Sequence, residues 1–192
     1  IIKKLDKFRK YNKSLFNFFS KDNEKLCFYL QGGVGLGKTM ILDFFFNFLK
    51  IPKKRLHFNE FMINLHDFRH NNKDNSINAF VKKLKKYDLI YLDELQVTNI
   101  VDAMILGKLF ETIFSEKIKI LITSNIKVEN LYKDGLQREQ FIPFIQIIKK
   151  NSIEGELIIN EDYRKLIAGS SQRIFFPLNE KNTFKINQMF RE

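Results

Sequence analysis

Short apolar runs alternate along this chain with longer segments whose apolar residues recur at helical spacing. The runs predict strands at 25–30, 55–58, 88–94, 117–123 and 156–159. The longer segments predict helices at 1–19, 40–49, 59–69, 77–86, 100–115 and 136–150, the last with a proline near its first turn. Strands that alternate with helices are typical of α/β proteins. The pattern therefore predicts a five-stranded, mainly parallel sheet flanked by helices.

The two ends of the chain differ from this pattern. Residues 1–24 contain an amphipathic lead-in helix, which we expect to cover one face of the sheet rather than to bind a membrane. Residues 25–160 form the predicted core, and 161–192 form a C-terminal extension in which the signals weaken. The extension predicts only a turn at 170–172, an extended run at 173–176 and a helix at 182–190.

A glycine-rich segment joins the first predicted strand to its helix. It reads Gly-Gly-Val-Gly-Leu-Gly-Lys-Thr and fits the phosphate-loop pattern G-x-x-x-x-G-K-[ST]. A backbone without side chains can direct several N–H donors at a triphosphate, and the next helix points its positive end there. Lys38 would reach the β- and γ-phosphate oxygens, and the Thr39 hydroxyl would ligate Mg²⁺. The predicted nucleotide-binding residues are Gly32, Gly33, Val34, Gly35, Leu36, Gly37, Lys38, Thr39 and Met40.

A chance match in a glycine-rich turn is the alternative to a nucleotide site. Half of the 8 glycines of the chain fall within 32–37, and a strand and a helix flank them in the order that a phosphate loop needs. Both observations favour the nucleotide site. The guanine-reading motif Asn-Lys-x-Asp does not occur in the sequence, so we expect ATP rather than GTP.

Polar side chains follow the third and fourth predicted strands. Asp93 and Glu94 end the third strand, where phosphate-loop enzymes place the carboxylates that hold Mg²⁺ and activate the attacking water. Asn125 follows the fourth strand. Because the carboxyl ends of parallel strands share the ligand-binding edge, Asn125 can reach the γ-phosphate or the water. Capping of a turn is the alternative role for Asn125.

Arg138 lies near the start of the last predicted helix. An arginine at this place can point out of its own site toward the γ-phosphate of a neighbouring subunit, as an arginine finger in trans. An ion pair with Glu139 or Asp134 is the structural alternative.

The charge of the chain is strongly positive. There are 33 Lys and Arg residues against 22 Asp and Glu, a net charge of +11, which favours nucleic acid or an anionic membrane as a partner. The chain is also rich in Lys, Ile, Asn and Phe, a composition that an A·T-rich coding sequence produces without selection for polyanions. We therefore expect the basic clusters at 1–25 and 82–86 to be solvated faces.

The cysteine content and the length of the apolar runs bear on the cellular compartment and on membrane association. Cys27 is the only cysteine, which excludes an intramolecular disulfide and is typical of a reducing compartment. No apolar run approaches the length of about 18 residues that a membrane span needs. We expect a soluble protein with peripheral membrane contact at most.

These motifs together resemble an AAA+ ATPase module. More narrowly, the chain resembles the ZapE family of bacterial cell-division-associated ATPases and their mitochondrial AFG-type relatives. The likeness is carried by 32–39, 57–62, 92–106, 122–125 and 130–144, with a smaller match at 162–164. The runs Gln96-Val97-Thr98 and Gly135-Leu136-Gln137-Arg138 are its most specific parts. Three positions depart from the family, namely Asn59 for the usual His, Leu95 for Phe and Asn99 for Asp, and none touches the triphosphate chemistry.

The resemblance implies an ATPase that works as a ring, expected to be a hexamer, with ATP and Mg²⁺ as cofactors. It would use hydrolysis to remodel or translocate a client such as a division or inner-membrane protein, with Arg138 acting in trans. It implies a bacterial cytoplasmic location, peripheral at the inner membrane or division site, with the mitochondrial matrix side as the alternative. Family members are longer, so we expect the lid and its sensor arginine to be partial or absent here. Phe61 and Met62 would face the pore of the ring, or belong to the core.

Two other functions fit the same fold. A helicase-loader-like AAA+ ATPase would act on DNA, as the basic charge and the Thr-Ser-Asn ending at 123–125 suggest, but the runs at 96–99 and 135–138 favour the first reading. An ATP-gated docking module would have little turnover. The intact pair Asp93 and Glu94 argues against such a module.

Overall fold

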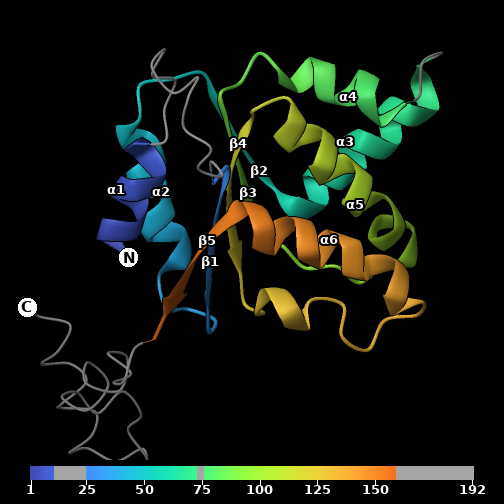
Figure 1. Cartoon of the computed structure of the whole chain (residues 1–192). Coiled ribbons are helices and arrows are strands. Elements are labelled where there is room, and N and C mark those ends of the chain that lie inside the picture. Colours follow the sequence, from blue (N-terminus) through green and yellow to red (C-terminus); the bar gives the residue numbers. More distant parts are fainter. Residues whose placement is uncertain (11–24, 73–75, 159–192) are drawn as a thin grey trace, which may run out of the picture. The chain divides into compact units, whose positions relative to one another are not determined.

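Five strands form one parallel sheet in the computed structural model, which describes residues 1–10, 25–72 and 76–158 (Figure 1). The strands are β1 Cys27–Gly32, β2 Lys53–His57, β3 Leu89–Asp93, β4 Lys119–Ser124 and β5 Ser152–Leu157. Their order across the sheet is β2-β3-β4-β1-β5, and every neighbouring pair is parallel. β3 is buried along its whole length, as expected for an inner strand of a parallel sheet. The predicted α/β fold is confirmed.

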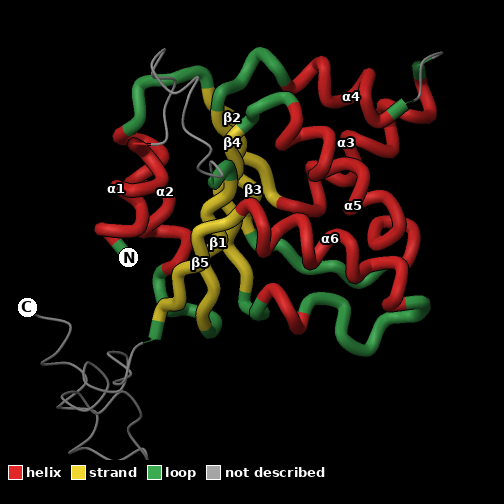
Figure 2. Tube along the Cα trace, in the orientation of Figure 1, coloured by secondary structure: helices red, strands yellow, loops and turns green. Residues whose placement is uncertain are grey.

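Helices cover both faces of the sheet (Figure 2). They are α1 Ile2–Lys10, α2 Lys38–Phe48, α3 Phe58–Asn71, α4 Ile77–Leu84, α5 Ile100–Ser115 and α6 Arg138–Asn151, with a 3-10 turn, η2, at Val128–Asn130. α1 and α2 pack on one face, and α3 to α6 pack on the other. Side-chain alternation along β1 explains this division. Phe28 and Leu30 join the cluster with α1 and α2, whereas Cys27 and Tyr29 join the cluster with the other helices.

The connections after β1 and β4 leave the sheet toward opposite faces. β1 leads into α2 on one face, and β4, its hydrogen-bonded neighbour, leads through η2 into α6 on the other. Where two neighbouring strands diverge in this way, a crevice opens outside their carboxyl ends, and ligands of open α/β sheets bind there. The phosphate loop follows β1 and Asn125 follows β4. The fold therefore brings both motifs to the same crevice.

The lead-in helix covers the sheet, as predicted, over the residues that the structure describes. Leu5 and Phe8 of α1 are buried in one cluster with Phe28 of β1 and Phe45 of α2. The ring of Phe8 lies 6.0 Å from that of Phe28 and 6.4 Å from that of Phe45, measured between centroids. The rest of the predicted helix 1–19, and the turn, extended run and helix predicted beyond residue 160, lie outside the described residues.

The fifth strand begins earlier than predicted. β5 runs over Ser152–Leu157 and follows α6 with no loop between them, whereas the sequence predicts a strand at 156–159. Gly155 obscured the strand pattern because glycine is rare inside strands. A Cβ at this position would lie 3.2 Å from Cδ1 of Leu30 and 3.3 Å from Cζ of Phe28, so these side chains would have to shift by a few tenths of an ångström to admit it. β1 and β5 thus pack closely at this point.

Phe110 of α5 anchors the larger cluster. It is fully buried, and its ring centroid lies 5.1 Å from that of Phe144 and 5.9 Å from that of Phe114. Phe110→Ala is expected to lower the free energy of unfolding by about 3–5 kcal/mol, because a cavity replaces the ring. Phe44→Ala, at a side chain that is 79% exposed, is the control and should cost about 0.5 kcal/mol or less. Urea unfolding followed by circular dichroism measures both, and equal costs would contradict this assignment.

Candidate active site

The phosphate loop turns the chain from β1 into α2. Gly35 and Gly37 have φ angles of 74° and 84°, a region that residues with a Cβ rarely adopt. Gly32 is needed for another reason, since a Cβ there would lie 2.7 Å from the carbonyl oxygen of Leu157 on β5. Among the residues that the structure describes, no side chain caps the first turn of α2, and the positive end of this helix suits an anionic ligand.

Lys38 lies at the centre of the site and is only 8% exposed. Its Nζ atom donates hydrogen bonds to the carbonyl oxygens of Gly32 at 2.8 Å and Gly33 at 2.7 Å, and to Oδ1 of Asn125 at 2.7 Å. Burial lowers the pKa of Lys38, and the carboxylates at the end of β3 offset part of this effect. The bond to Asn125 connects the phosphate loop to the end of β4.

Asp93, at the end of β3, is buried and accepts four side-chain hydrogen bonds. Its Oδ1 accepts from the hydroxyls of Thr39 at 3.1 Å, Tyr91 at 3.1 Å and Thr123 at 2.5 Å. Its Oδ2 accepts from Nη2 of Arg55 at 2.5 Å. Burial by itself would raise the pKa of Asp93, but these four hydrogen bonds outweigh it and hold the pKa below its usual value. The carboxylate is therefore ionised and fixed in orientation.

Three of these partners are not predicted from the sequence, namely Arg55, Tyr91 and Thr123. Part of the signal was present, because side chains two residues apart on a strand share a face and Tyr91 precedes Asp93 by two. Arg55 joins them because β2 pairs with β3 in a register that places it opposite Tyr91. This strand neighbourhood is a property of the fold and not of any local pattern.

The pairing of Thr39 with Asp93 suits a single magnesium ion. Mg²⁺ binds oxygen ligands at about 2.0–2.1 Å and keeps several waters, so a carboxylate that is hydrogen-bonded to a direct ligand can hold the ion through its hydration shell. Oγ1 of Thr39 lies 3.1 Å from Oδ1 of Asp93. Among the described residues, no cluster of three or more His, Cys, Asp and Glu side chains could hold a metal by itself. The residues therefore fit an ion that takes most of its ligands from nucleotide and water, as Mg²⁺ commonly does.

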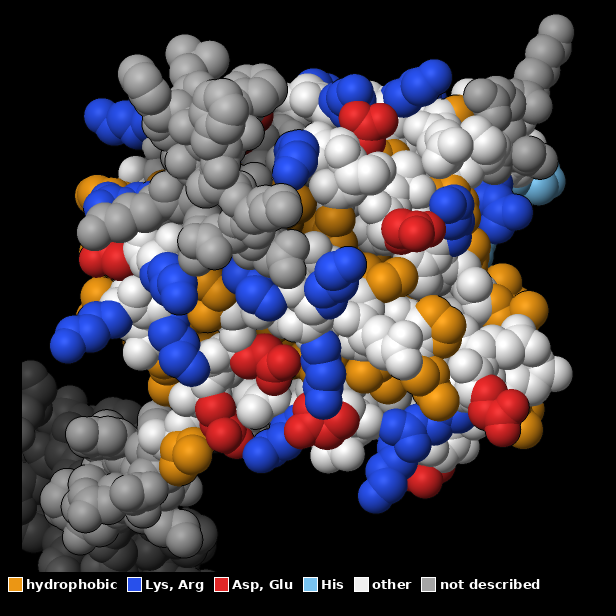
Figure 3. All heavy atoms as spheres, viewed as in Figure 1, with side chains coloured by type: hydrophobic (Ala, Val, Ile, Leu, Met, Phe, Trp, Pro, Cys, Tyr) orange, Lys and Arg blue, Asp and Glu red, His pale blue; other side chains and the backbone are white. Residues whose placement is uncertain are grey.

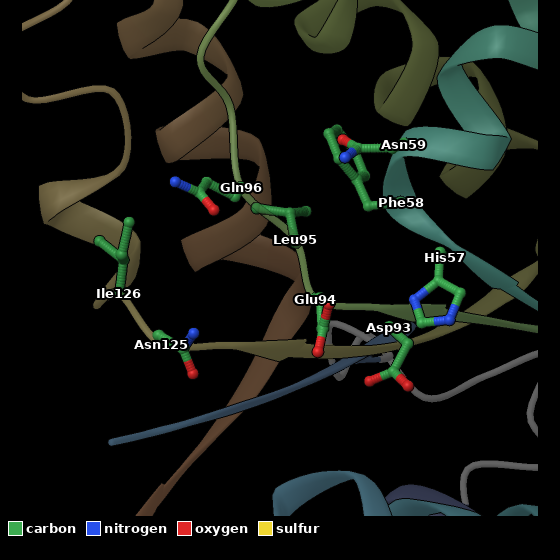
Figure 4. A pocket seen from close by; sticks show the side chains of 9 residues that line it. All are labelled: His57, Phe58, Asn59, Asp93, Glu94, Leu95, Gln96, Asn125 and Ile126. Carbon is green, nitrogen blue, oxygen red and sulfur yellow. The ribbon is translucent and has the colours of Figure 1, made fainter. Parts of the chain in front are cut away.

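Glu94 and Asn125 border a cleft of about 560 Å³ beside this cluster. In Figure 4 the carboxylates of Asp93 and Glu94 and the amide oxygen of Asn125 point toward the same side of the cleft. The lining residues are His57, Phe58, Asn59, Asp93, Glu94, Leu95, Gln96, Asn125 and Ile126. The cleft can admit the water that attacks a bound triphosphate.

The backbone of Glu94 adopts an unusual conformation. Its φ angle is 59°, in the left-handed region that non-glycine residues seldom occupy. Two hydrogen bonds hold the turn in place, from the Glu94 N–H to Oγ1 of Thr123 at 2.8 Å and from the Leu95 N–H to the Thr123 carbonyl at 2.8 Å. The end of β3 is thus tied to β4, and the direction of the Glu94 side chain is set by its neighbours.

Arg138 is the one predicted catalytic residue that the structure does not bring into this cluster. It is the first residue of α6, and its Nη2 atom donates to the carbonyl oxygen of Glu129 at 2.7 Å. Its Nε atom is buried and has no acceptor within the described part of the chain. The predicted alternative, an ion pair with Glu139 or Asp134, is not found among the described residues.

Phe61 and Met62 belong to the core. Phe61 is fully buried and Met62 is 3% exposed, both within the larger apolar cluster. The expectation that they line a pore is wrong for both residues, because α3 turns this side of the segment toward the sheet. The alternative core role is confirmed.

Comparison with known proteins supports this assignment of motifs. Residues 3–192 match the family described as AFG1-like ATPase. Lactation elevated protein 1 homolog B of Danio rerio is 35% identical over 189 residues, which cover 90% of this chain and 38% of that protein. Cell division protein ZapE of Escherichia coli K12 is 32% identical over 166 residues, covering 84% of this chain and 44% of that protein.

Solved structures share the fold at lower identity. A crystal structure of DnaI aligns with a TM-score of 0.59 and 20% identity over 82% of this chain and 80% of that one. AMPPCP-bound DnaA from Aquifex aeolicus aligns with a TM-score of 0.58 and 19% identity over 92% of this chain and 52% of that one. At this identity the likeness concerns the fold alone, and it is the AAA+ phosphate-loop fold.

Proposed function

Because the chain belongs to the AFG1-like ATPase family, we propose that it hydrolyses Mg-ATP in the crevice between β1 and β4. The observation that carries the proposal is the meeting of three distant segments. Lys38 lies 2.7 Å from Asn125, and Thr39 lies 3.1 Å from Asp93. The chain spans 38% and 44% of the two relatives described above, so the proposal concerns the nucleotide-hydrolysing module of such a protein.

In this proposal the phosphate loop binds the phosphates, and Thr39 together with Asp93 at the end of β3 holds the metal ion. Lys38 exchanges its bonds to the loop carbonyls for the β- and γ-phosphate oxygens. The Thr39 hydroxyl would ligate Mg²⁺ through its oxygen while it still donates its hydrogen bond to Oδ1 of Asp93. Oδ1 of Asp93, the oxygen beside Thr39, already accepts from three hydroxyls, which leaves it no lone pair for a direct bond to the ion. We therefore assign Asp93 to the hydration shell of the ion. A magnesium ion held there would supply positive charge that offsets the negative charge developing on the phosphate oxygens.

Glu94 and Asn125 act on the γ-phosphate side. Glu94 accepts a proton from the attacking water, and its position in the cleft leaves its carboxylate accessible to that water. Asn125 releases Lys38 when the nucleotide binds and turns its amide to the water or the γ-phosphate. Both roles need a residue at the carboxyl end of a strand, where the sheet holds it rigidly.

The module works as a ring, for which we propose a hexamer, and Arg138 completes the site of the neighbouring subunit. Arg138 contacts Glu129 rather than the Lys38 and Asp93 cluster of its own chain in the described structure, which supports a role between subunits. By similarity to cell division protein ZapE, we propose that hydrolysis remodels or translocates a division or inner-membrane protein in the cytoplasm or at the membrane surface.

Mixing two inactive variants tests the trans role of Arg138. Arg138→Ala and Glu94→Gln should each lose most ATP turnover, since an arginine finger contributes about 10³ to 10⁵ in rate. Mixed subunits should regain measurable turnover, because some interfaces then pair an intact Glu94 with an intact Arg138. Turnover is measured against the mixing ratio at a protein concentration that sustains the ring. Arg69→Ala, at an exposed arginine of α3, is the control. A mixture as inactive as its components would refute action in trans.

The alternative hypothesis, a helicase-loader-like AAA+ ATPase that acts on DNA, has less support. Figure 3 shows Lys and Arg side chains interspersed with Asp and Glu on the face in view, not gathered into a single basic surface. DNA binding through such a surface predicts an affinity that falls steeply with salt and ATPase activity that single-stranded DNA stimulates.

No helix among the described residues has both the length and the apolar character that crossing a membrane requires.

A further inference from the structure

Arg55 holds the carboxylate on which the proposed metal site depends. Its guanidinium spans two elements, since Nη2 lies 2.5 Å from Oδ2 of Asp93 on β3 and Nη1 lies 2.9 Å from Oδ2 of Asp43 on α2. The guanidinium carbon also lies 5.1 Å from the ring centroid of Tyr91, within the range of a cation–π contact. Arg55 is therefore fixed in three directions by β3 and α2.

This contact differs from an ordinary surface ion pair. The Asp93 side chain is 2% exposed, whereas those of Arg55 and Asp43 are 37% and 29% exposed. Exposed pairs contribute little because water competes for both charges. Water cannot replace the charged partner of a buried carboxylate, so the loss of that partner is strongly destabilising. Asp43 adds a second anchor that keeps the guanidinium over Asp93.

The two oxygens of Asp93 have different partners. Among the described residues, Oδ1 accepts from Thr39, Tyr91 and Thr123, whereas Oδ2 accepts from Arg55 alone. Arg55 and the three hydroxyls thus set together how the carboxylate is rotated about its last bond. Without Arg55, Oδ2 would be buried with no donor from the described residues, and the group would turn toward other donors or solvent. That rotation would take Oδ1 away from the Thr39 hydroxyl.

We propose that Arg55, braced by Asp43, is a positioning residue that orients Asp93 and Thr39 for the metal–nucleotide complex. This inference rests on the proposed Mg-ATP function. The planar fork of the guanidinium is essential to the role, because one group must donate to two carboxylates in fixed directions.

Charge and position predict opposite effects of removing Arg55. Loss of a cation beside Asp93 would by charge alone strengthen binding of Mg²⁺. Loss of orientation weakens it, and outer partners of metal ligands typically contribute about 10- to 100-fold in metal affinity or activity. The sign of the change therefore separates the two effects.

The test compares Arg55→Gln with Lys54→Gln. Lys54 is the adjacent exposed residue of β2, whose side chain lies on the opposite face, so the charge change is matched. Affinity for a fluorescent ATP analogue is measured in EDTA and in Mg²⁺. Arg55→Gln should leave the EDTA affinity within about twofold and reduce the gain on adding Mg²⁺ by about 10-fold or more. An unchanged or larger gain overturns the proposal, and thermal melts of each variant establish that it is folded.

Two further variants examine the bridge itself. Asp43→Asn should reduce the Mg²⁺ gain in the same direction but less, and the double variant should be no worse than Arg55→Gln, because Asp43 acts through Arg55. Arg55→Lys keeps the charge but lacks the fork, so recovery of the full gain in that variant would overturn the geometric role.

The proposed function can fail separately from this inference. If the unsubstituted chain shows no Mg²⁺-dependent gain in ATP affinity, the proposed function fails and Arg55 has no metal site to position. If the unsubstituted chain gains affinity and Arg55→Gln gains as much, only the role of Arg55 is overturned.

Discussion

ATP turnover by Glu94→Gln is expected to fall about 10²- to 10⁴-fold, because a positioned general base contributes about that much to the rate. Glutamine keeps the size and polarity of the side chain but cannot take the proton of the attacking water. The backbone hydrogen bond from Glu94 to Thr123 does not involve the side chain, so the turn after β3 should persist. We accordingly expect the affinity for Mg-ATP to be nearly unchanged.

Phosphate release and binding of a fluorescent nucleotide, measured on the same preparation, separate these two effects. Glu111→Gln, at an exposed position of α5, makes the same chemical change away from the cleft and should leave turnover unaltered. Equal hydrolysis by Glu94→Gln and the unsubstituted chain would end the assigned role of Glu94. Negligible turnover by the unsubstituted chain, with normal binding, would favour the ATP-gated docking module instead.

Lys38→Met is expected to abolish nucleotide binding in the concentration range where the unsubstituted chain binds. Charge-assisted hydrogen bonds contribute about 1.5–3 kcal/mol each, so losing two to the phosphate oxygens corresponds to about 10²- to 10⁴-fold in affinity. The ammonium also holds the phosphate loop together through the carbonyls of Gly32 and Gly33, and its removal leaves these carbonyls without that donor. We expect the phosphate loop to be less well ordered in this variant, which would weaken the binding of any phosphate ligand.

Titration with a fluorescent ATP analogue in EDTA isolates the lysine from the metal. Lys82→Met, on the exposed side of α4, is the control and should bind as tightly as the unsubstituted chain. The change at Lys38 should not unfold the protein, because methionine fills much of the same volume in a buried place. Undiminished affinity of a folded Lys38→Met protein would contradict the phosphate-binding role.

The parts of the site that the sequence predicts are those coded by local spacing. A phosphate loop is continuous in sequence. Some of its glycines adopt backbone conformations that residues with a Cβ rarely adopt, as the φ angle of 84° at Gly37 illustrates. Asp93 and Asn125 were predictable because Asp93 ends one apolar strand and Asn125 directly follows another, and parallel strands end at one edge. In the structure Lys38 lies within hydrogen-bond distance of Asn125, and Thr39 of Asp93.

The parts that the sequence does not predict depend on which strands are neighbours. Arg55 lies 38 residues from Asp93 along the chain, and only the pairing of β2 with β3 brings them together. Gly155 obscured the start of β5, and the close packing of Leu30 against it is a property of the assembled sheet. Phe61 is aromatic, as a residue that grips a polypeptide in a ring pore can be, but it lies in the core. Its burial depends on which side of α3 faces the sheet.

The direct passage from α6 into β5 has a mechanical consequence. Arg138 begins α6, which passes with no loop into β5, and Leu157 of β5 pairs with Gly32 at the start of the phosphate loop. In the proposed ring, a displacement of Arg138 by an adjoining subunit would therefore be transmitted through α6 and β5 to the nucleotide site. Nucleotide occupancy in one subunit would in this way influence the next.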